Sequence, residues 1–178
     1  MYPKDELNEG KRRRMLRLSL FIIVFMDKIL LVQTIEEAIK NTDYFLVDVR
    51  ILPGNEVIVE IDNKSGVDLD FCAALNRKIE AVFDRDVEDY SLEVGSAGLT
   101  APFKVRGQYE KNLNNTVEVL TKDGRKLYGV LVAVEDSLFT IEMEKKIKPE
   151  GAKKKILIKE QESFAYDAVK YVKYDFKV

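Results

Sequence analysis

The stretch that decides the fold is Tyr90–Phe103, which reads Y-S-L-E-V-G-S-A-G-L-T-A-P-F. Apolar residues first alternate with polar ones at Tyr90, Leu92 and Val94, a pattern typical of a half-buried strand. The G-S-A-G run at residues 95–98 then breaks the alternation, and an extended segment is expected over residues 99–102. We predict that two small domains meet at this stretch and that its loop is a functional surface.

Charge changes sign at the same place. Residues 26–100 contain seven Lys/Arg and sixteen Asp/Glu, a net charge of −9, whereas residues 101–178 contain sixteen and twelve, a net charge of +4. An acidic half attracts basic partners and a basic half attracts phosphate, so a ribonucleoprotein is a natural candidate partner. The alternative is that these charges only keep two faces solvated.

Composition argues against catalysis. The chain has 178 residues, is 46% hydrophobic and contains no histidine. Its one cysteine, Cys72, excludes an internal disulfide and a cysteine-based zinc cluster, and the missing histidine removes the usual general base. We therefore predict a globular, non-catalytic protein that uses no metal, cofactor or small-molecule substrate.

The first 25 residues differ from the rest. A basic run at residues 11–14 precedes an apolar segment at residues 15–26, as in a secretory signal, but Asp27 and Lys28 follow where small residues would mark cleavage. The segment is also shorter than the roughly 20 apolar residues that span a bilayer. We interpret residues 1–25 as an extension outside the working fold, with Met26 as a candidate translation start. A membrane-surface anchor is the alternative.

Periodicity predicts an acidic α+β domain over residues 26–99. A helix is expected at 28–40, a hairpin at 44–51 and 57–61 with Asp62 facing outward, and a final strand from residue 90. A second helix starts at a cap formed by Asp68 or Asp70 and runs to about residue 84. The two aspartates could also be read as a metal-binding pair, but no third acidic ligand follows at the spacing of a calcium loop. The apolar face of that helix is predicted to comprise Phe71, Leu75, Ile79 and Val82.

After a linker at residues 100–104, residues 105–178 predict a basic domain. A short helix lies within 105–113, and five strands follow at 116–120, 127–134, 138–143, 156–159 and 168–172. Five short strands suggest an SH3-like or Sm-like small β-barrel, with a bend or bulge at Gly129. The D-G-R-x-x-x-G run at residues 123–129 also resembles a strand pair of Sm-like domains.

Lysines gather between the third and fourth of these strands. Six occur within residues 145–155, beside a proline and a glycine, and predict a mobile loop that binds phosphate backbone in a salt-dependent way. A merely solvated connection is the alternative. The candidate RNA-binding residues are Lys122, Arg125, Lys126, Lys145, Lys146, Lys148, Lys153, Lys154 and Lys155. The late aromatic residues Tyr166, Tyr171, Tyr174 and Phe176 could stack on bases, although barrel core and rim is the preferred interpretation.

The G-S-A-G run has the G-x-x-G form of KH-domain loops. Such a loop joins two helices, whereas this one leaves a strand, so a plain turn is the preferred interpretation. Ser96 is not predicted to be a hydrolase nucleophile, because the spacing differs from G-x-S-x-G and no histidine could take its proton.

The central stretch carries a resemblance to the RimP family of ribosome maturation factors. The signature of that family is matched by Leu92, Glu93, Val94, Ser96, Gly98, Leu99 and Pro102. The chain departs from it at Gly95, at Ala97 and at Thr100-Ala101, where an acid-arginine pair is usual. A looser match lies in the second helix, at Asp70, Cys72, Asn76 and Arg77. The resemblance covers residues 28–178 and agrees with a KH-like or half-ferredoxin-like domain followed by a small barrel.

The resemblance implies a cytoplasmic bacterial factor needed for maturation of the small (30S) ribosomal subunit. Members bind the free subunit, with a basic small-subunit ribosomal protein near the decoding region as an implied contact of the acidic domain, and ribosomal RNA as a contact of the barrel. The implied partner-binding residues are Arg77, Glu93, Ser96, Gly98, Leu99 and Pro102. We expect a monomer that does not bind membranes. The alternative function is an Sm-like RNA-binding regulatory protein.

Overall fold

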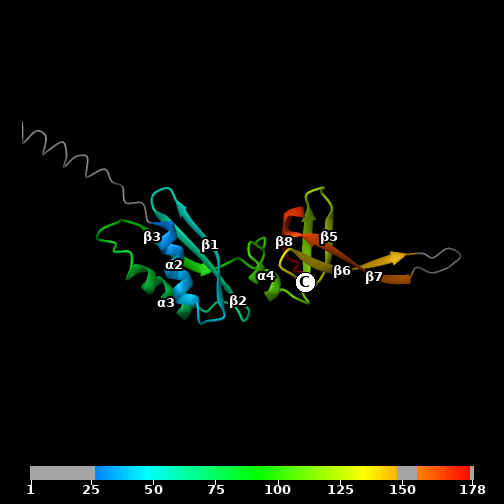
Figure 1. Cartoon of the computed structure of the whole chain (residues 1–178), viewed down its shortest axis with the longest axis horizontal. Coiled ribbons are helices and arrows are strands. Elements are labelled where there is room, and N and C mark those ends of the chain that lie inside the picture. The colour runs from blue at the N-terminus through cyan, green and yellow to red at the C-terminus, as the bar shows by residue number, and fades with distance from the viewer. Residues whose placement is uncertain (1–26, 148–155, 177–178) are drawn as a thin grey trace, which may run out of the picture.

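The chain folds into two lobes, each built on its own sheet (Figure 1). The computed structural model describes residues 27–147 and 156–176. In chain order the elements are α2 Lys28–Ile39, β1 Tyr44–Leu52, β2 Glu56–Asn63, α3 Leu69–Glu80, β3 Ser91–Ser96, α4 Arg106–Lys111, β4 Thr116–Thr121, β5 Lys126–Val134, β6 Leu138–Ile147, β7 Ile156–Ala165, the 3-10 turn η1 Tyr166–Ala168 and β8 Val169–Tyr174. The predicted α+β class is confirmed: the described residues contain two sheets and three α-helices.

The first lobe is a three-stranded sheet in the order β1-β2-β3 with α2 and α3 packed against it. β1 and β2 form the predicted antiparallel hairpin, whereas β2 and β3 run parallel because α3 carries the chain back across the sheet. The buried side chains of α2 and α3 complete the core: Leu31, Ile35, Ile39, Cys72, Leu75 and Ile79.

Both long helices begin at aspartate caps. The carboxylate of Asp27 accepts the backbone N–H of Ile29 at 2.9 Å, and that of Asp68 accepts the N–H of Asp70 at 3.0 Å. Of the two predicted caps for α3, Asp68 is therefore the one used. The predicted end at residue 84 is wrong: α3 ends at Glu80, so Val82 is 50% exposed.

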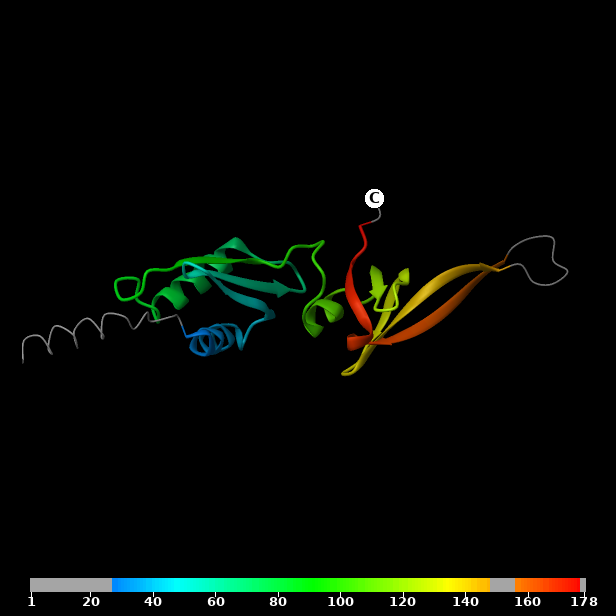
Figure 2. The ribbon, with the colours of Figure 1, turned by 90° about the horizontal axis from the view of Figure 1, so that it is seen from above.

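The second lobe is a five-stranded antiparallel sheet in the order β7-β6-β5-β4-β8. All five predicted strands are present, but β6 and β7 are much longer than expected and pair as far as Ile147 and Ile156. This ribbon projects from the rest of the lobe (Figure 2). Lys145 and Lys146, predicted to lie in a loop, are therefore strand residues.

The bulge predicted at Gly129 lies three residues farther on, at Val132. The register of β5 against β6 shifts between Leu131 and Ala133. Gly129 instead allows the backbones of β5 and β6 to approach closely: a Cβ built at this position would lie 2.8 Å from the carbonyl oxygen of Glu142 on β6. The strands approach too closely at this point for any side chain.

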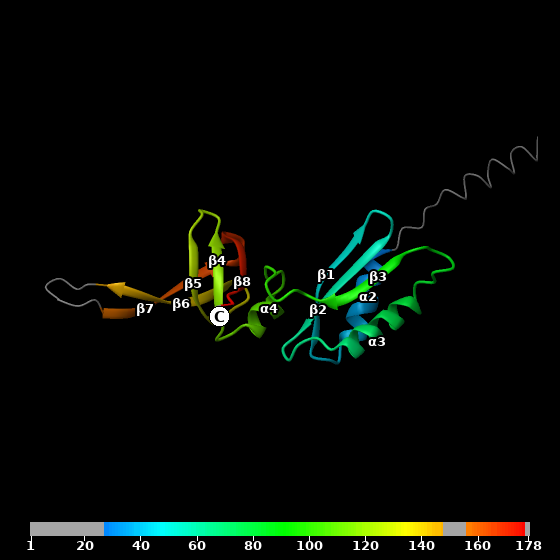
Figure 3. The same cartoon turned by 180° about the vertical axis from the view of Figure 1, so that it is seen from behind.

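Each lobe has its own hydrophobic core. One comprises α2, α3 and the three-stranded sheet, and the other is centred on Phe139 with Tyr109, Val119, Leu131 and Val172. The short helix α4 lies between the lobes (Figure 3) and contributes Tyr109 to the second core. Among the described residues, none of the helices has the length and apolarity that crossing a bilayer requires. The predictions for residues 1–25 lie outside the described part of the chain.

Candidate partner-binding and nucleic-acid interfaces

A shallow groove on the first lobe brings Arg77 and Glu93 together. Arg77 and Asn76 project from α3, and Glu93 projects from the adjacent strand β3, with Cys72 at the base. Arg77 and Glu93 are exposed, whereas Cys72 is buried, and burial raises the pKa of its thiol. Residues predicted from two separate motifs, 16 positions apart, thus line one surface, which can present both charges to a partner.

The other predicted partner-binding residues lie where β3 ends. Ser96 is the last residue of β3, and the backbone N–H of Ala101 donates to the carbonyl of Gly98 at 2.9 Å. This hydrogen bond closes a turn, so the extended run predicted for residues 99–102 is wrong. The turn leaves Leu99 65% exposed and Pro102 exposed, at the start of the connection between the lobes.

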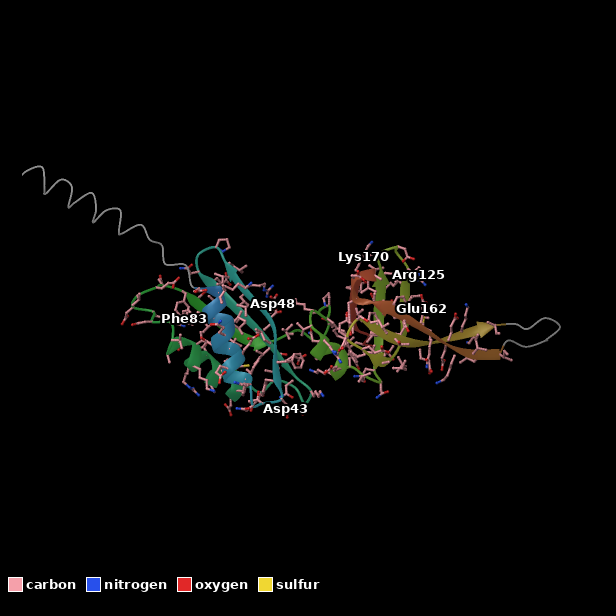
Figure 4. All side chains as sticks on the ribbon, viewed as in Figure 1. Asp43, Asp48, Phe83, Arg125, Glu162 and Lys170 are labelled. Atoms are coloured by element: carbon pink, nitrogen blue, oxygen red, sulfur yellow. The ribbon has the colours of Figure 1, made fainter. Side chains whose placement is uncertain are left out.

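Ion pairs join this connection to the first lobe. The Lys104 ammonium donates to Asp48 at 2.7 Å and to Glu60 at 2.8 Å. These hydrogen bonds lower the pKa of Asp48 and raise the pKa of Lys104. Figure 4 shows Asp48 on the sheet of the first lobe. Lys104, in the connection that follows the first lobe, therefore bridges Asp48 and Glu60 on the sheet of that lobe.

A second ion pair is more deeply buried. Lys111 of α4 lies 2.7 Å from Asp62 of β2, whose side chain is 7% exposed. Asp62 was predicted to face outward by alternation, and that prediction is wrong because α4 covers its end of the strand. Nearby, Gly107 packs so closely on Phe45 that an added Cβ would lie 2.8 Å from the ring. No local sequence pattern links Lys111 to Asp62, because the two residues are 49 positions apart.

Of the five predicted RNA-binding cations that the structure describes, Arg125, Lys126 and Lys145 pair with acids. Arg125 lies 3.1 Å from Asp123 and 2.9 Å from Glu162, its neighbour in Figure 4. Lys145 lies 3.3 Å from Glu160 on the paired strand. The pairs of Arg125 and Lys145 are exposed and therefore weak, so phosphate could displace the carboxylates.

Two of the predicted cations, Lys122 and Lys146, are exposed and have no acidic partner among the described residues. Lys122 lies in the turn between β4 and β5, and Lys146 lies near the end of β6. The predictions for Lys148, Lys153, Lys154 and Lys155 fall outside the described residues.

Lys126 belongs to a polar cluster that the sequence did not indicate. Its ammonium lies 3.1 Å from Glu118, which also accepts the Tyr171 hydroxyl at 2.6 Å and lies 3.6 Å from Lys173. Burial opposes ionisation of Glu118, but the hydrogen bonds from Tyr171 and Lys126 outweigh it and lower the pKa. Tyr171 is thus a partner of a buried carboxylate. No group of His, Cys, Asp or Glu in the described ranges is arranged to hold a metal ion.

Comparison with known proteins gives one family, from a family model and from whole-protein relatives. A family model described as the RimP N-terminal domain matches residues 34–100. A ribosome maturation factor RimP of Porphyromonas gingivalis is 43% identical over 130 residues, 73% of this chain and 86% of that protein. Proteins of the same name from Flavobacterium psychrophilum and Christiangramia forsetii are 33% and 31% identical, over 70% and 68% of this chain and 80% and 79% of their own lengths.

Proposed function

This chain belongs to the RimP family of ribosome maturation factors, and from that premise we propose that it acts without catalysis on the small (30S) subunit. It binds the free subunit late in assembly and needs no cofactor. Its place of action is the cytoplasm, away from membranes, and its state is monomeric. The two lobes correspond to a KH-like domain at residues 26–99 and an SH3-like barrel at residues 105–178, joined by residues 100–104.

The observation that carries this proposal is the separation of charge between the two lobes. The acidic lobe contacts a basic ribosomal protein near the decoding region, using the groove that holds Arg77 and Glu93 and the turn at residues 96–102. An acidic surface suits a basic partner, and an exposed Leu99 offers an apolar contact at its edge.

The basic lobe contacts ribosomal RNA. Lys122 and Lys146 are its most available cations, because their ammonium groups have no acidic partner among the described residues. Arg125, Lys126 and Lys145 exchange intramolecular carboxylates for phosphate, at some cost in affinity. Contacts of this kind read no sequence and weaken as salt rises.

Sedimentation of the full-length chain with separated small subunits, large subunits and joined ribosomes tests the proposal. We expect co-migration with free small subunits alone, weakened by salt. Lys122→Glu combined with Lys146→Glu should reduce binding and flatten its salt dependence, because each lost phosphate contact lowers the slope. Arg77→Glu should reduce binding without changing that slope. Lys28→Glu, an exposed site on α2, is the matched control.

Binding to large subunits or to joined ribosomes with equal strength would contradict the choice of the small subunit. A ring-sized oligomer that binds short RNA and ignores subunits would instead favour the Sm-like regulatory function. Unchanged subunit binding by the double lysine variant would remove the barrel from the RNA contact.

A further inference from the structure

A cavity of 240 Å³ lies between the two lobes. The first lobe contributes Asp62 and the turn that contains Gly98 and Leu99, and the second contributes α4 and the end of β8. Figure 2 shows the end of β8 beside this connection, where the backbone N–H of Phe103 donates to the carbonyl of Val172 at 2.8 Å. This volume is below the usual range of about 300–1,000 Å³ for small-molecule sites, so it suits one ring system.

A buried amide lines this cavity in a fixed orientation. Gln108 is 4% exposed, and its side-chain oxygen accepts the backbone N–H of Lys104 at 2.7 Å and that of Val105 at 3.3 Å. These two bonds hold the amide so that its NH2 group is the remaining donor. Among the described residues, that NH2 group has no acceptor. The residue as a whole is buried, but this nitrogen reaches the surface of the cavity, where a ligand or water that presents an acceptor can bind it.

Two asparagines add a second polar edge. The Asn112 side-chain nitrogen donates to the backbone carbonyl of Gln108 at 2.8 Å, and the Asn115 side-chain nitrogen donates to the Asn112 side-chain oxygen at 3.5 Å. The Asn115 side-chain oxygen is left as an acceptor, with no donor in the described part of the chain. The cavity therefore offers a donor and an acceptor together.

Aromatic and aliphatic side chains form the apolar part of the cavity wall. Tyr174 and Phe176 lie edge to face, with ring centroids 4.8 Å apart and planes at 84°. Phe176 is 54% exposed and Leu99 is 65% exposed, a large apolar area for residues at the edge of a cavity. A flat group that entered here would cover both of them.

Charge narrows the class of ligand. The Asp62 carboxylate is already paired with Lys111, so a cationic side chain from a basic protein would find no unpaired acid here. An anionic group would have to approach Asp62. The surroundings favour a neutral, planar ring with hydrogen-bond acceptors and donors on its edge, and the bases of RNA have these properties.

We infer that the cavity between the lobes binds one unstacked nucleobase of single-stranded RNA, with Gln108 and Asn115 on its edge and Phe176 against its face. This inference rests on the RNA contact of the proposed function and adds a site that reads a base. A base seated here touches both lobes and therefore fixes the angle between them when RNA is bound.

Fluorescence anisotropy of the full-length chain with a labelled hexauridylate tests this site. Phe176→Ala should weaken binding about tenfold, because stacking of one base on one ring is worth about that much. Asn115→Ala should weaken it by a smaller factor. An otherwise identical oligonucleotide with abasic sugars should bind the wild type as weakly as it binds Phe176→Ala. Val87→Ala, at a residue 75% exposed on the first lobe, is the matched control.

NMR gives a direct second measurement. Uridine monophosphate should shift the side-chain NH2 resonances of Gln108 in the wild type and not in Phe176→Ala. Salt-dependent hexauridylate binding that is indifferent to Phe176→Ala and to loss of the bases would overturn the nucleobase site and leave the proposed function standing. No binding of any RNA would overturn both. Loss of subunit binding in Phe176→Ala with unchanged RNA binding would assign the cavity to a protein side chain and reject the inference.

Discussion

Glu118 lies on β4 directly opposite Tyr128 of β5 and Lys173 of β8 and is only 6% exposed. Replacing it with glutamine keeps the volume but removes the charge that Lys126 and Lys173 share. We expect Glu118→Gln to lower the free energy of unfolding by about 1 kcal/mol at pH 7, measured by urea denaturation, because both lysines remain partly solvated. Glu160→Gln, which breaks an exposed pair, should change it by less than about 0.5 kcal/mol.

The pH dependence of this difference follows from the lowered pKa of Glu118. A depressed carboxyl pKa stabilises the folded state fully above the ordinary value of 4.5, and that contribution is lost as the pH falls through the lower folded value. The difference in the free energy of unfolding between the wild type and Glu118→Gln should therefore be constant above about pH 5.5. It should shrink to zero as the pH falls below the ordinary pKa. A gap that persisted in strong acid would mean that the variant disturbs packing rather than charge.

At the scale of elements, α3 is the helix on which the groove depends. Its Asp68 cap holds the first turn, which includes Cys72 and precedes Arg77. Asp68→Ala should lower the free energy of unfolding by about 1 kcal/mol, measured by the loss of helical circular dichroism in urea. Asp70→Asn, which loses a first-turn charge but no cap, should cost only a few tenths of a kcal/mol. Equal effects would assign the role to charge and not to capping.

A helix or strand could be predicted from the sequence where the pattern that indicates it lies within its own residues. The alternation of β1 and β2 and the spacing of α2 were readable because each buries one face against one core. The lengths of β6 and β7 were not predictable, since Lys145 and Lys146 resemble loop residues until each strand is seen to be stabilised by its partner. The end of α3 was missed because the apolar spacing of four and three continues to Val82, although Phe83 and not Val82 is buried in that core.

In the candidate site, too, the residues that belong to short motifs could be predicted, and the contacts between distant parts of the chain could not. Arg77 and Glu93 were predicted from short motifs, and the packing of α3 on β3 brings them together. The contact of Lys111 with Asp62, and the cavity around Gln108, depend on one lobe meeting the other, which no local pattern encodes. Alternation along β2 predicted that Asp62 faces solvent. The residue is buried instead, because α4, which comes later in the chain, covers it.

For the whole molecule, the junction sets how the two lobes move. Lys111→Met keeps most of the side-chain volume and leaves the buried Asp62 without its cation, which should cost on the order of 2 kcal/mol. We expect a larger radius of gyration in small-angle X-ray scattering, because the lobes then meet less tightly. Lys122→Met, at an exposed turn lysine, should change neither quantity. An unchanged radius of gyration in Lys111→Met would show that Lys104 and the packing of Gly107 suffice to hold the lobes.

The parallel pairing of β2 with β3 also sets an order of events in time. The first sheet is complete once Ser96 has been synthesised, and it needs nothing from the second lobe. The last strand, β8, ends 78 residues later, at Tyr174, which takes roughly 4–16 s at bacterial and eukaryotic elongation rates. The helix that covers Phe45 and Asp62, α4, ends at Lys111, 15 residues after Ser96, but its Tyr109 belongs to the second core, which β8 completes. The growing chain must then deliver α4 to a surface that is already formed, so assembly of the junction is a docking step and not part of a single cooperative collapse.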